Sequence, residues 1–333
     1  MSDASVGSIL VCRLSALGDV VLSQAVAAAL AERYPQATRT FLSREPYGRI
    51  LAGNPAVGEL ALWAGAGHPL PESVRARRWD VVCDLSGSGR SRRLLAAVSA
   101  GRVLRVRKQT WQRFAFVRLR RVGGARVSLE PAIDRLFTTV APLGIERGGR
   151  VPFLAERDDS AADVVVVAPG AGRETKRWDE ARFAEVAERL VASGKRVVVV
   201  AATHEREIAE AVVRDLDPRR AVLSLHDDPS GLPAIVRAAG VALTNDSGLM
   251  HVAEACGVPV VAIFGPTHPR LGFAPLRADS VVLHTGIECS PCDIHGPARC
   301  PKGHHRCMTE ISVDRVLGEV EHRVAQGAHP WPR

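Results

Sequence analysis

One eight-residue stretch carries several side chains that could bind a phosphorylated ligand. Residues 244–251 (TNDSGLMH) follow the apolar run 240–243 and precede a helix-like segment, which is typical of a strand end that turns into a helix. Free backbone N–H groups and the helix dipole favour an anion at such a turn. Ser247 and Gly248 could hold a phosphate there. Asp246 could fix the turn or be an ordinary N-cap, and His251 could face the ligand or be a hydrogen-bonded surface residue.

A second break between a strand and a helix lies near the start of the chain. Residues 8–14 (SILVCRL) are an apolar run typical of a buried parallel strand, and residues 20–33 have a helical pattern. Between them lie Ser15, Gly18 and Asp19. On the residues alone, the favoured role of Asp19 is to cap the following helix.

Four cysteines form a third candidate site. Their spacing is Cys289-x2-Cys292-x7-Cys300-x6-Cys307, with His304 and His305 inside the last interval. Such a cluster among Gly and Pro predicts a tetrahedral structural zinc site. An iron–sulfur cluster would use the same ligands, and plain reduced thiols are the remaining interpretation. The other cysteines lie in apolar segments and are predicted core residues: Cys12, Cys83 and Cys256.

Alternating strands and helices must position these residues. In the first half, strands are predicted at 8–14, 37–42, 59–63, 80–85 and 102–106, with a helix over 131–143. In the second half, strands are predicted at 163–168, 195–202, 221–225, 240–243 and 258–264, with helices over 179–192, 204–216 and 232–239. This alternation predicts two doubly wound α/β domains. Ligands of such sheets bind beyond the carboxyl ends of the strands, so loops 15–19, 169–178, 203–207, 245–251 and 265–268 could line one cleft.

Length and composition restrict the class of protein. The 333 residues exceed one usual hydrophobic core, and 46% hydrophobic with 24% charged residues is ordinary for a soluble protein. The charged connector 144–160 marks the domain boundary, which gives domains over 1–157 and 158–311, the latter with the Cys-rich insert 289–307. No long apolar stretch and no signal-peptide pattern is present, so we expect a cytoplasmic protein.

The formal net charge of +8 is concentrated in the first half of the chain. Residues 1–157 contain 24 Lys and Arg against 12 Asp and Glu, and residues 85–129 contain no acidic residue. Such a basic block attracts polyanions: nucleic acid, anionic lipid or a phosphorylated saccharide. It could also be a solvated face in a chain that uses Arg throughout, because only four of the 44 basic residues are Lys.

Four motifs together resemble glycosyltransferase family 9, the ADP-heptose:lipopolysaccharide heptosyltransferases. They are RLSALGDV at 13–20, PGA at 169–171 followed by KRW at 176–178, NDSGLMH at 245–251 and FGPT at 264–267. Their order and spacing cover nearly the whole chain. The resemblance implies a GT-B architecture, in which two facing Rossmann-like domains enclose the active site. It also implies that the last segment, 312–333, contains a helix over 312–326 that packs back toward the first domain.

The resemblance also gives roles to individual residues. It implies that Asp19 is the general base, which takes the proton of the acceptor hydroxyl as it attacks the anomeric carbon. Lys176 would stabilise the charge on the departing diphosphate. The residues expected to bind the nucleotide sugar are Glu205, Asp246, Ser247, Gly248, Leu249, His251, Gly265 and Thr267, although Glu207 would fit the ribose nearly as well as Glu205. The residues expected on the acceptor side are Ser15, Arg113, Arg118 and Arg121.

The sequence therefore predicts an inverting glycosyltransferase that moves a heptose or similar sugar from an ADP-sugar to a lipopolysaccharide core. We expect no catalytic metal, no nucleic acid, a phosphorylated glycolipid acceptor, and a monomer that touches the anionic inner membrane on its cytoplasmic face. Two alternatives stay open: another sugar or acceptor within the family, and a nucleic-acid-binding protein that uses the basic block. A dinucleotide-dependent oxidoreductase is disfavoured because neither first-strand turn has a G-x-G-x-x-G motif.

Overall fold

The first domain is built on a five-stranded parallel sheet. The computed structural model describes residues 6–119 and 126–326. The strands lie in the order β3-β2-β1-β4-β5, and every pairing is parallel. Their bounds are β1 Ser8–Cys12, β2 Thr38–Arg44, β3 Glu59–Trp63, β4 Trp79–Asp84 and β5 Ala100–Arg105. The central strand β1 is buried on both faces, which explains its continuous apolar sequence.

Helix α1 (Leu17–Arg33) joins this sheet to the rest of the molecule. Eleven of its 17 residues are buried, because it packs on its own sheet on one side and on the second domain on the other. The remaining helices are α2 Glu72–Arg75, α3 Gly89–Leu95, α4 Thr110–Arg118 and α5 Ala132–Phe137. The helix predicted over 131–143 is divided, since α5 ends at Phe137 and a separate 3-10 turn covers Ala141–Leu143.

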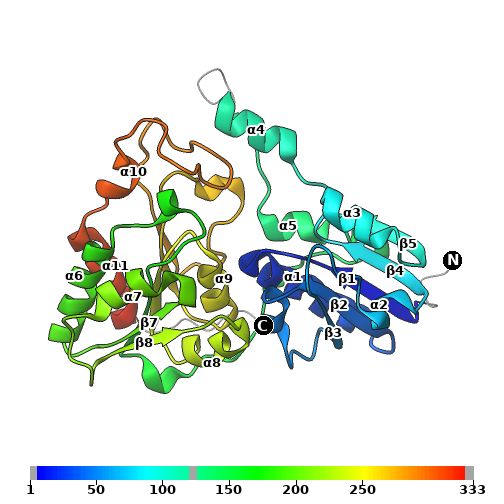
Figure 1. The fold of residues 1–333 in the computed structure, drawn as a ribbon, viewed down its shortest axis with the longest axis horizontal. Helices are drawn as coiled ribbons and strands as arrows, with labels where there is room; N and C mark the ends of the chain where they lie inside the picture. The colour runs from blue at the N-terminus through cyan, green and yellow to red at the C-terminus, as the bar shows by residue number, and fades with distance from the viewer. Residues whose placement is uncertain (1–5, 120–125, 327–333) are drawn as a thin grey trace.

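The second domain repeats the arrangement with six parallel strands in the order β11-β10-β9-β6-β7-β8. Their bounds are β6 Val164–Ala168, β7 Arg196–Ala201, β8 Ala221–Leu225, β9 Val241–Asn245, β10 Val260–Ile263 and β11 Val281–Leu283. The helices are α6 Glu180–Ala192, α7 Arg206–Val213, α8 Leu232–Val236, α9 Gly248–Ala255, α10 Arg306–Thr309 and α11 Val313–Gln326. The short strand β11 was not predicted. The two sheets lie in two lobes with α1 and α9 between them (Figure 1).

The last helix, α11, does not pack toward the first domain as expected. Its apolar side chains Val316, Leu317 and Val320 belong to the cluster beneath the second sheet, and α11 lies against α6, β9 and β10. An ion pair between Arg189 and Asp314 at 2.7 Å adds to this contact. The expectation is therefore wrong for the described part of the segment, because the apolar face of α11 completes the core of its own domain. Residues 327–333 lie outside the described range.

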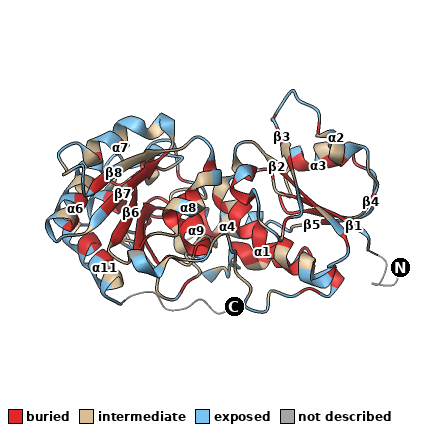
Figure 2. Cartoon of the chain, turned by 90° about the horizontal axis from the view of Figure 1, so that it is seen from below, coloured by how far each residue is buried: buried red, intermediate tan, exposed pale blue. Residues whose placement is uncertain are grey.

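One apolar core crosses the boundary between the two domains. It joins residues of β1 and α1 to residues of β6, α8 and α9 without a polar gap. Figure 2 shows buried residues concentrated along α1 and α9, where the two lobes meet. Burial of this kind resists separation of the lobes, since apolar area would be exposed to water. No helix among the described residues is both long enough and apolar enough to cross a bilayer.

Candidate active site

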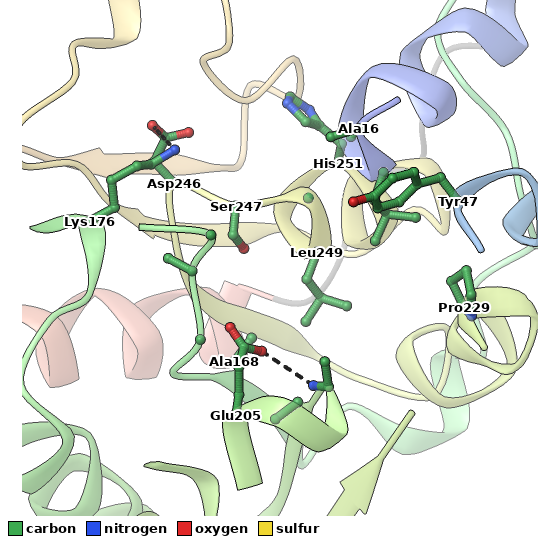
Figure 3. Close-up of a pocket in the computed structure, with 18 of the residues that line it drawn as sticks. Ala16, Tyr47, Ala168, Lys176, Glu205, Pro229, Asp246, Ser247, Leu249 and His251 are labelled. Atoms are coloured by element: carbon green, nitrogen blue, oxygen red, sulfur yellow. Dashed lines mark hydrogen bonds and ion pairs between the residues drawn. The ribbon is translucent and has the colours of Figure 1, made fainter. Parts of the chain in front are cut away.

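A cleft of about 720 Å³ opens between the two domains at the carboxyl ends of their strands. The first domain contributes residues 16–19 and the pair Pro46 and Tyr47. The second domain contributes the loops after β6, β7 and β9 and the start of α9. Figure 3 shows Lys176 and Asp246 together at one end of this cleft, with Glu205, Tyr47 and Pro229 at other parts of its wall.

Helices α1 and α9 touch within the cleft through two glycines. A Cβ added at Gly18 would lie 2.6 Å from Cδ2 of His251, and one added at Gly248 would lie 3.0 Å from Cβ of Leu17. Neither position has room for a side chain. The need for a glycine at position 18, in the first turn of α1, is explained by this close approach, which brings Asp19 of the first domain beside the start of α9 in the second.

The carboxylate of Asp19 lies in the first turn of α1 and faces the cleft. Its Oδ1 pairs with Nη2 of Arg13 at 2.5 Å, and its side chain is 26% exposed. Its Oδ2 accepts only a long hydrogen bond, 3.4 Å, from the backbone N–H of Ala16. Arg13 is itself held by the carbonyl oxygens of Ser15 and Leu85. Asp19 therefore caps α1 only weakly while it faces the cleft, and its Oδ2 remains accessible to a substrate.

Two arginines of the first domain lie near Asp19 and beside Phe273, which lines the cleft. The guanidinium of Arg113 lies 5.5 Å from the ring centre of Phe273, and that of Arg135 lies 5.9 Å from it. Burial lowers the pKa of Arg113, while the charge of Asp19 raises it. Burial also lowers the pKa of Arg135, to about 10, so both side chains remain cations at pH 7. In the described structure Nε and Nη2 of Arg113 are buried without a hydrogen-bond partner, which favours an anionic ligand there.

Across the cleft, Lys176 is fixed at the start of α9. Its Nζ pairs with Oδ2 of Asp246 at 2.8 Å, and Oγ1 of Thr267 donates to the same oxygen at 2.6 Å. The Asp246 carboxylate thus orients Lys176 rather than capping α9. Asn245 holds the loop that carries Lys176, because its side chain donates to the carbonyl of Pro169 and accepts from the N–H of Trp178. The free N–H groups of α9 and the ammonium of Lys176 together make an anion site.

His251 is a buried, neutral ring between these groups. It is 5% exposed, and burial lowers its pKa to about 4 against the opposing charges of Asp246 and Asp19. Its Nδ1 has no hydrogen-bond partner among the described residues. The interpretation of His251 as a surface residue is therefore wrong. A neutral imidazole in this place can donate one hydrogen bond to a ligand without bringing a charge.

Glu205 lies where the loops after β6 and β7 meet. Its Oε2 accepts a 3.3 Å hydrogen bond from the N–H of Ala202. A Cβ at Gly170 would lie 2.2 Å from this oxygen, so the glycine is needed for the carboxylate to pack over the loop. Both residues line the cleft together with Asp227 and Tyr47. This wall offers carboxylate oxygens and an aromatic ring, which suit the hydroxyls and base of a nucleoside.

Most of the residues predicted for the site line this one cleft, namely Asp19, Lys176, Glu205, Asp246, Ser247, Gly248, Leu249 and His251. Thr267 contributes indirectly, through its hydrogen bond to Asp246. Gly265 packs against Met308 of α10. Ser15 contributes only its carbonyl, to Arg13. Arg113 faces the cleft region, Arg118 is exposed, and Arg121 lies outside the described residues.

The four cysteines of the insert do not form the expected zinc site. Among the described residues no three Cys, His, Asp or Glu side chains are arranged to hold a metal ion. Burial raises the pKa of Cys307 to about 12, and the neighbouring charges of Cys292, Cys300 and Cys289 add to this rise. Burial also raises the pKa of Cys300, but the backbone N–H groups of residues 302–305 outweigh it and lower that pKa overall. The thiols thus lie near one another without a metal-binding arrangement, and the zinc prediction is not supported.

The same insert instead holds the loop that carries Lys176. Oγ1 of Thr175 donates to the carbonyl of Pro297 at 2.5 Å, and Nε2 of His305 donates to the carbonyl of Thr175 at 2.8 Å. Gly296, with φ of +85°, lies so close that an added Cβ would be 2.9 Å from Cγ of Lys176. The insert therefore packs against the loop that carries Lys176 and holds that loop in place.

Several residues of the cleft were missed from the sequence, among them Tyr47, Asp227, Phe273 and His295. Phe273 and His295 are single rings in irregular loops, whereas Tyr47 begins a 3-10 turn over Tyr47–Leu51. Burial lowers the pKa of His295, and the charge of Arg113 adds to this effect. The only sequence signal was the position of Phe273 and His295 in Gly- and Pro-bearing segments after β10, and it does not show which way the rings point.

Comparison with known proteins decides the family. Residues 68–296 match the model of "Glycosyltransferase family 9 (heptosyltransferase)". This chain belongs to glycosyltransferase family 9. Across 94% of the chain and 97% of the relative, it is 28% identical to lipopolysaccharide heptosyltransferase 2 of Escherichia coli K12.

Two solved structures of family 9 proteins share the fold. One is a glycosyltransferase family 9 protein from Veillonella parvula, with a TM-score of 0.77, 20% identity, and coverage of 96% of this chain and 98% of that one. The other is the E. coli ADP-heptose lipopolysaccharide heptosyltransferase II, with a TM-score of 0.73, 23% identity, and coverage of 96% and 99%. The family 9 chain thus has the GT-B architecture of two facing Rossmann-like domains, as expected, and its enzyme class is a nucleotide-sugar-dependent glycosyltransferase.

Proposed function

We propose that the protein is an inverting transferase that moves a heptose from ADP-heptose to a lipopolysaccharide core acceptor. The observation that carries this proposal is the meeting of Asp19 with the anion site of Lys176 and α9 across one cleft. A base on one wall and a phosphate site on the other are what a single displacement at a sugar carbon requires. The match to the family and the similarity to heptosyltransferases support the choice of sugar.

In this mechanism the acceptor hydroxyl approaches from the first domain. Oδ2 of Asp19, which has only a long internal hydrogen bond, takes the proton of that hydroxyl. The acceptor oxygen forms a bond to the anomeric carbon while the bond from that carbon to the β-phosphate oxygen breaks. Because attack and departure occur on opposite faces of the sugar, the configuration at the anomeric carbon inverts. Arg13 orients the carboxylate through its ion pair.

The leaving ADP gains negative charge on its terminal phosphate. The ammonium of Lys176 and the N–H groups at the start of α9 would stabilise that charge, and His251 would add a neutral hydrogen-bond donor. Glu205 and Asp227 would bind the ribose hydroxyls, with Tyr47 near the base. We expect that Lys176 and the helix N-terminus together replace a divalent metal ion in this role.

The acceptor would meet Arg113 and Arg135 before it reaches Asp19. The unpartnered buried N–H groups of Arg113, beside the cleft residue Phe273, suit a carboxylate or phosphate of a core saccharide. We retain the expectations of a monomer and of an acceptor held at the cytoplasmic face of an anionic membrane. The sugar, its acceptor hydroxyl and the nucleotide base are the points that a panel of donors and acceptors would identify.

Replacement of Asp19 tests the proposal directly. Asp19→Asn should lower transfer at least about a hundredfold, because general-base contributions are of that size, with donor affinity nearly unchanged. The assay is product formation from ADP-heptose, with donor binding followed by calorimetry. Asp314→Asn, on the surface of α11, is the matched control and should behave as wild type. Retention of more than about a tenth of the activity by Asp19→Asn would move the base to another residue.

A further inference from the structure

Helix α4 exposes an unusual amount of apolar side chain. Trp111 is 71% exposed and Phe114 41%, and Leu119, the residue after the helix, is 42% exposed. These three are half of the large exposed hydrophobic residues in the described structure. The rings of Trp111 and Phe114 stack on each other, with centroids 5.3 Å apart and planes 19° apart. A soluble protein rarely keeps two stacked aromatic rings in water unless the patch binds something.

The aromatic pair lies on the face of α4 that points away from the protein. Trp111, Phe114 and Arg118 recur at the spacing of one helical stripe. The opposite face is anchored, because Phe116 and Val117 pack on Leu271 of the second domain, and the guanidinium of Arg270 lies 4.9 Å from the ring of Phe116. Figure 1 shows α4 at the outer edge of the molecule, above the line between the lobes. The outer face is therefore presented by a fixed helix and not by a loose loop.

The stretch of sequence that contains α4 carries only positively charged side chains. Residues 85–129 contain twelve Lys and Arg and no Asp or Glu. Of these, Arg107, Lys108 and Arg118 are exposed at the two ends of α4. Aromatic rings flanked by cations are the composition of helices that lie in the interface of an anionic bilayer, where the rings enter the headgroup region and the cations meet lipid phosphates.

We propose that the outer face of α4, formed by Trp111, Phe114, Arg118 and Leu119, docks on an anionic lipid surface. The inner side of the same helix carries Arg113, which faces Phe273 and the neighbourhood of Asp19. Docking would therefore hold the mouth of the cleft against the membrane, where a lipid-anchored acceptor presents its charged sugars to Arg113. The membrane contact stands on the surface alone, whereas this delivery of the acceptor rests on the proposed function.

The test measures vesicle binding of the full chain and needs no activity. The wild type and the double variant W111S/F114S are floated with vesicles of phosphatidylcholine alone or of equal parts phosphatidylcholine and phosphatidylglycerol. We expect the wild type to bind only the anionic vesicles, more weakly at high salt, and the double variant to bind at least about tenfold less, because two interfacial rings are lost. Arg118→Glu should show a smaller loss. Val222→Ser, which removes a 54% exposed side chain from β8, is the matched control and should bind as wild type.

Three results would overturn the proposal. They are absence of wild-type binding to anionic vesicles, equal binding by W111S/F114S, and a wild-type dimer that the double variant converts to a monomer, which would assign the face to a second copy of the chain. Melting temperatures near that of the wild type show that the variants fold. Failure of the proposed function is distinguishable, because inactive wild-type protein that still binds vesicles through α4 would contradict the reaction and not the docking surface.

Discussion

At the scale of single residues, the imidazole of His251 links the chemistry of the cleft to the stability of the protein. Burial lowers its pKa to about 4, whereas in the unfolded chain it would titrate near its ordinary value of about 6.5. Between these values the unfolded chain binds more protons than the folded one, so the contribution of His251 to stability is full above about pH 6.5 and is lost as the pH falls toward 4.

This linkage predicts the effect of His251→Gln on acid sensitivity. Between pH 7 and pH 4 the wild type should lose up to about 3 kcal/mol more unfolding free energy than the variant, because the variant has no ring to protonate. Urea unfolding at a series of pH values measures the difference. His322→Gln, on the surface of α11, should follow the wild type. Parallel stability curves for wild type and His251→Gln would mean that the ring titrates normally in the folded protein.

At the scale of elements, the Cys-rich insert supports the loop that carries Lys176. His305 reaches the carbonyl of Thr175 from the start of α10, and Gly296 covers the Lys176 side chain. His305→Ala should therefore lower kcat about tenfold or more with a smaller change in acceptor KM, because the ammonium loses its fixed position against the leaving phosphate. Steady-state kinetics with donor and acceptor varied separately measure kcat and the acceptor KM and so distinguish the two effects.

A conservative replacement of His305 distinguishes an effect on the position of Lys176 from an effect on folding. His305→Asn keeps a side-chain donor and should recover part of the loss of kcat seen with His305→Ala, at an equal melting temperature. His322→Ala is the control for removal of a histidine on the surface of the second domain. If His305→Ala lowers the melting temperature but leaves kcat intact, the insert stabilises the domain without positioning Lys176.

The elements also show how far the sequence could lead. The alternation of apolar runs and amphipathic helices predicted both parallel sheets, and the motifs at the strand ends predicted the cleft residues Asp19, Lys176 and Asp246. That pattern could not predict the contacts and directions of side chains, because these depend on tertiary packing. The apolar face of α11 could have covered either domain, and the spacing of four thiols does not show whether their side chains take a metal-binding arrangement. The direction of Phe273 and His295 follows from loop geometry, which has no periodic signal.

At the scale of the whole molecule, the contact of α1 with α9 fixes how the two domains face each other. Gly18→Ala places a methyl group within 2.6 Å of the His251 ring, so the helices must separate or shift. We expect a loss of about 1–3 kcal/mol of stability together with reduced activity, as for other overpacked cores. Chemical denaturation and the transfer assay measure the two effects.

Gly318→Ala is the matched replacement, since position 318 is an exposed site inside α11 where an added Cβ meets nothing within 4 Å. Helix propensity alone should make it more stable by about 0.5–1 kcal/mol. Stabilisation by both alanines would show that α1 and α9 are free to move apart at no cost.

The glycine contact and the shared core also limit how this protein can be recombined with its relatives. A chimera that takes its first domain from one protein and its second domain from another could be cut in the connector between residues 144 and 160. In this molecule such a cut would divide one continuous apolar core and would pair helix α1 with a foreign partner. Exchange of donor specificity should therefore succeed when the facing positions of α1 and α9 already match in the two relatives. The two helices where the lobes meet, and not the connector, decide which lobes can be combined.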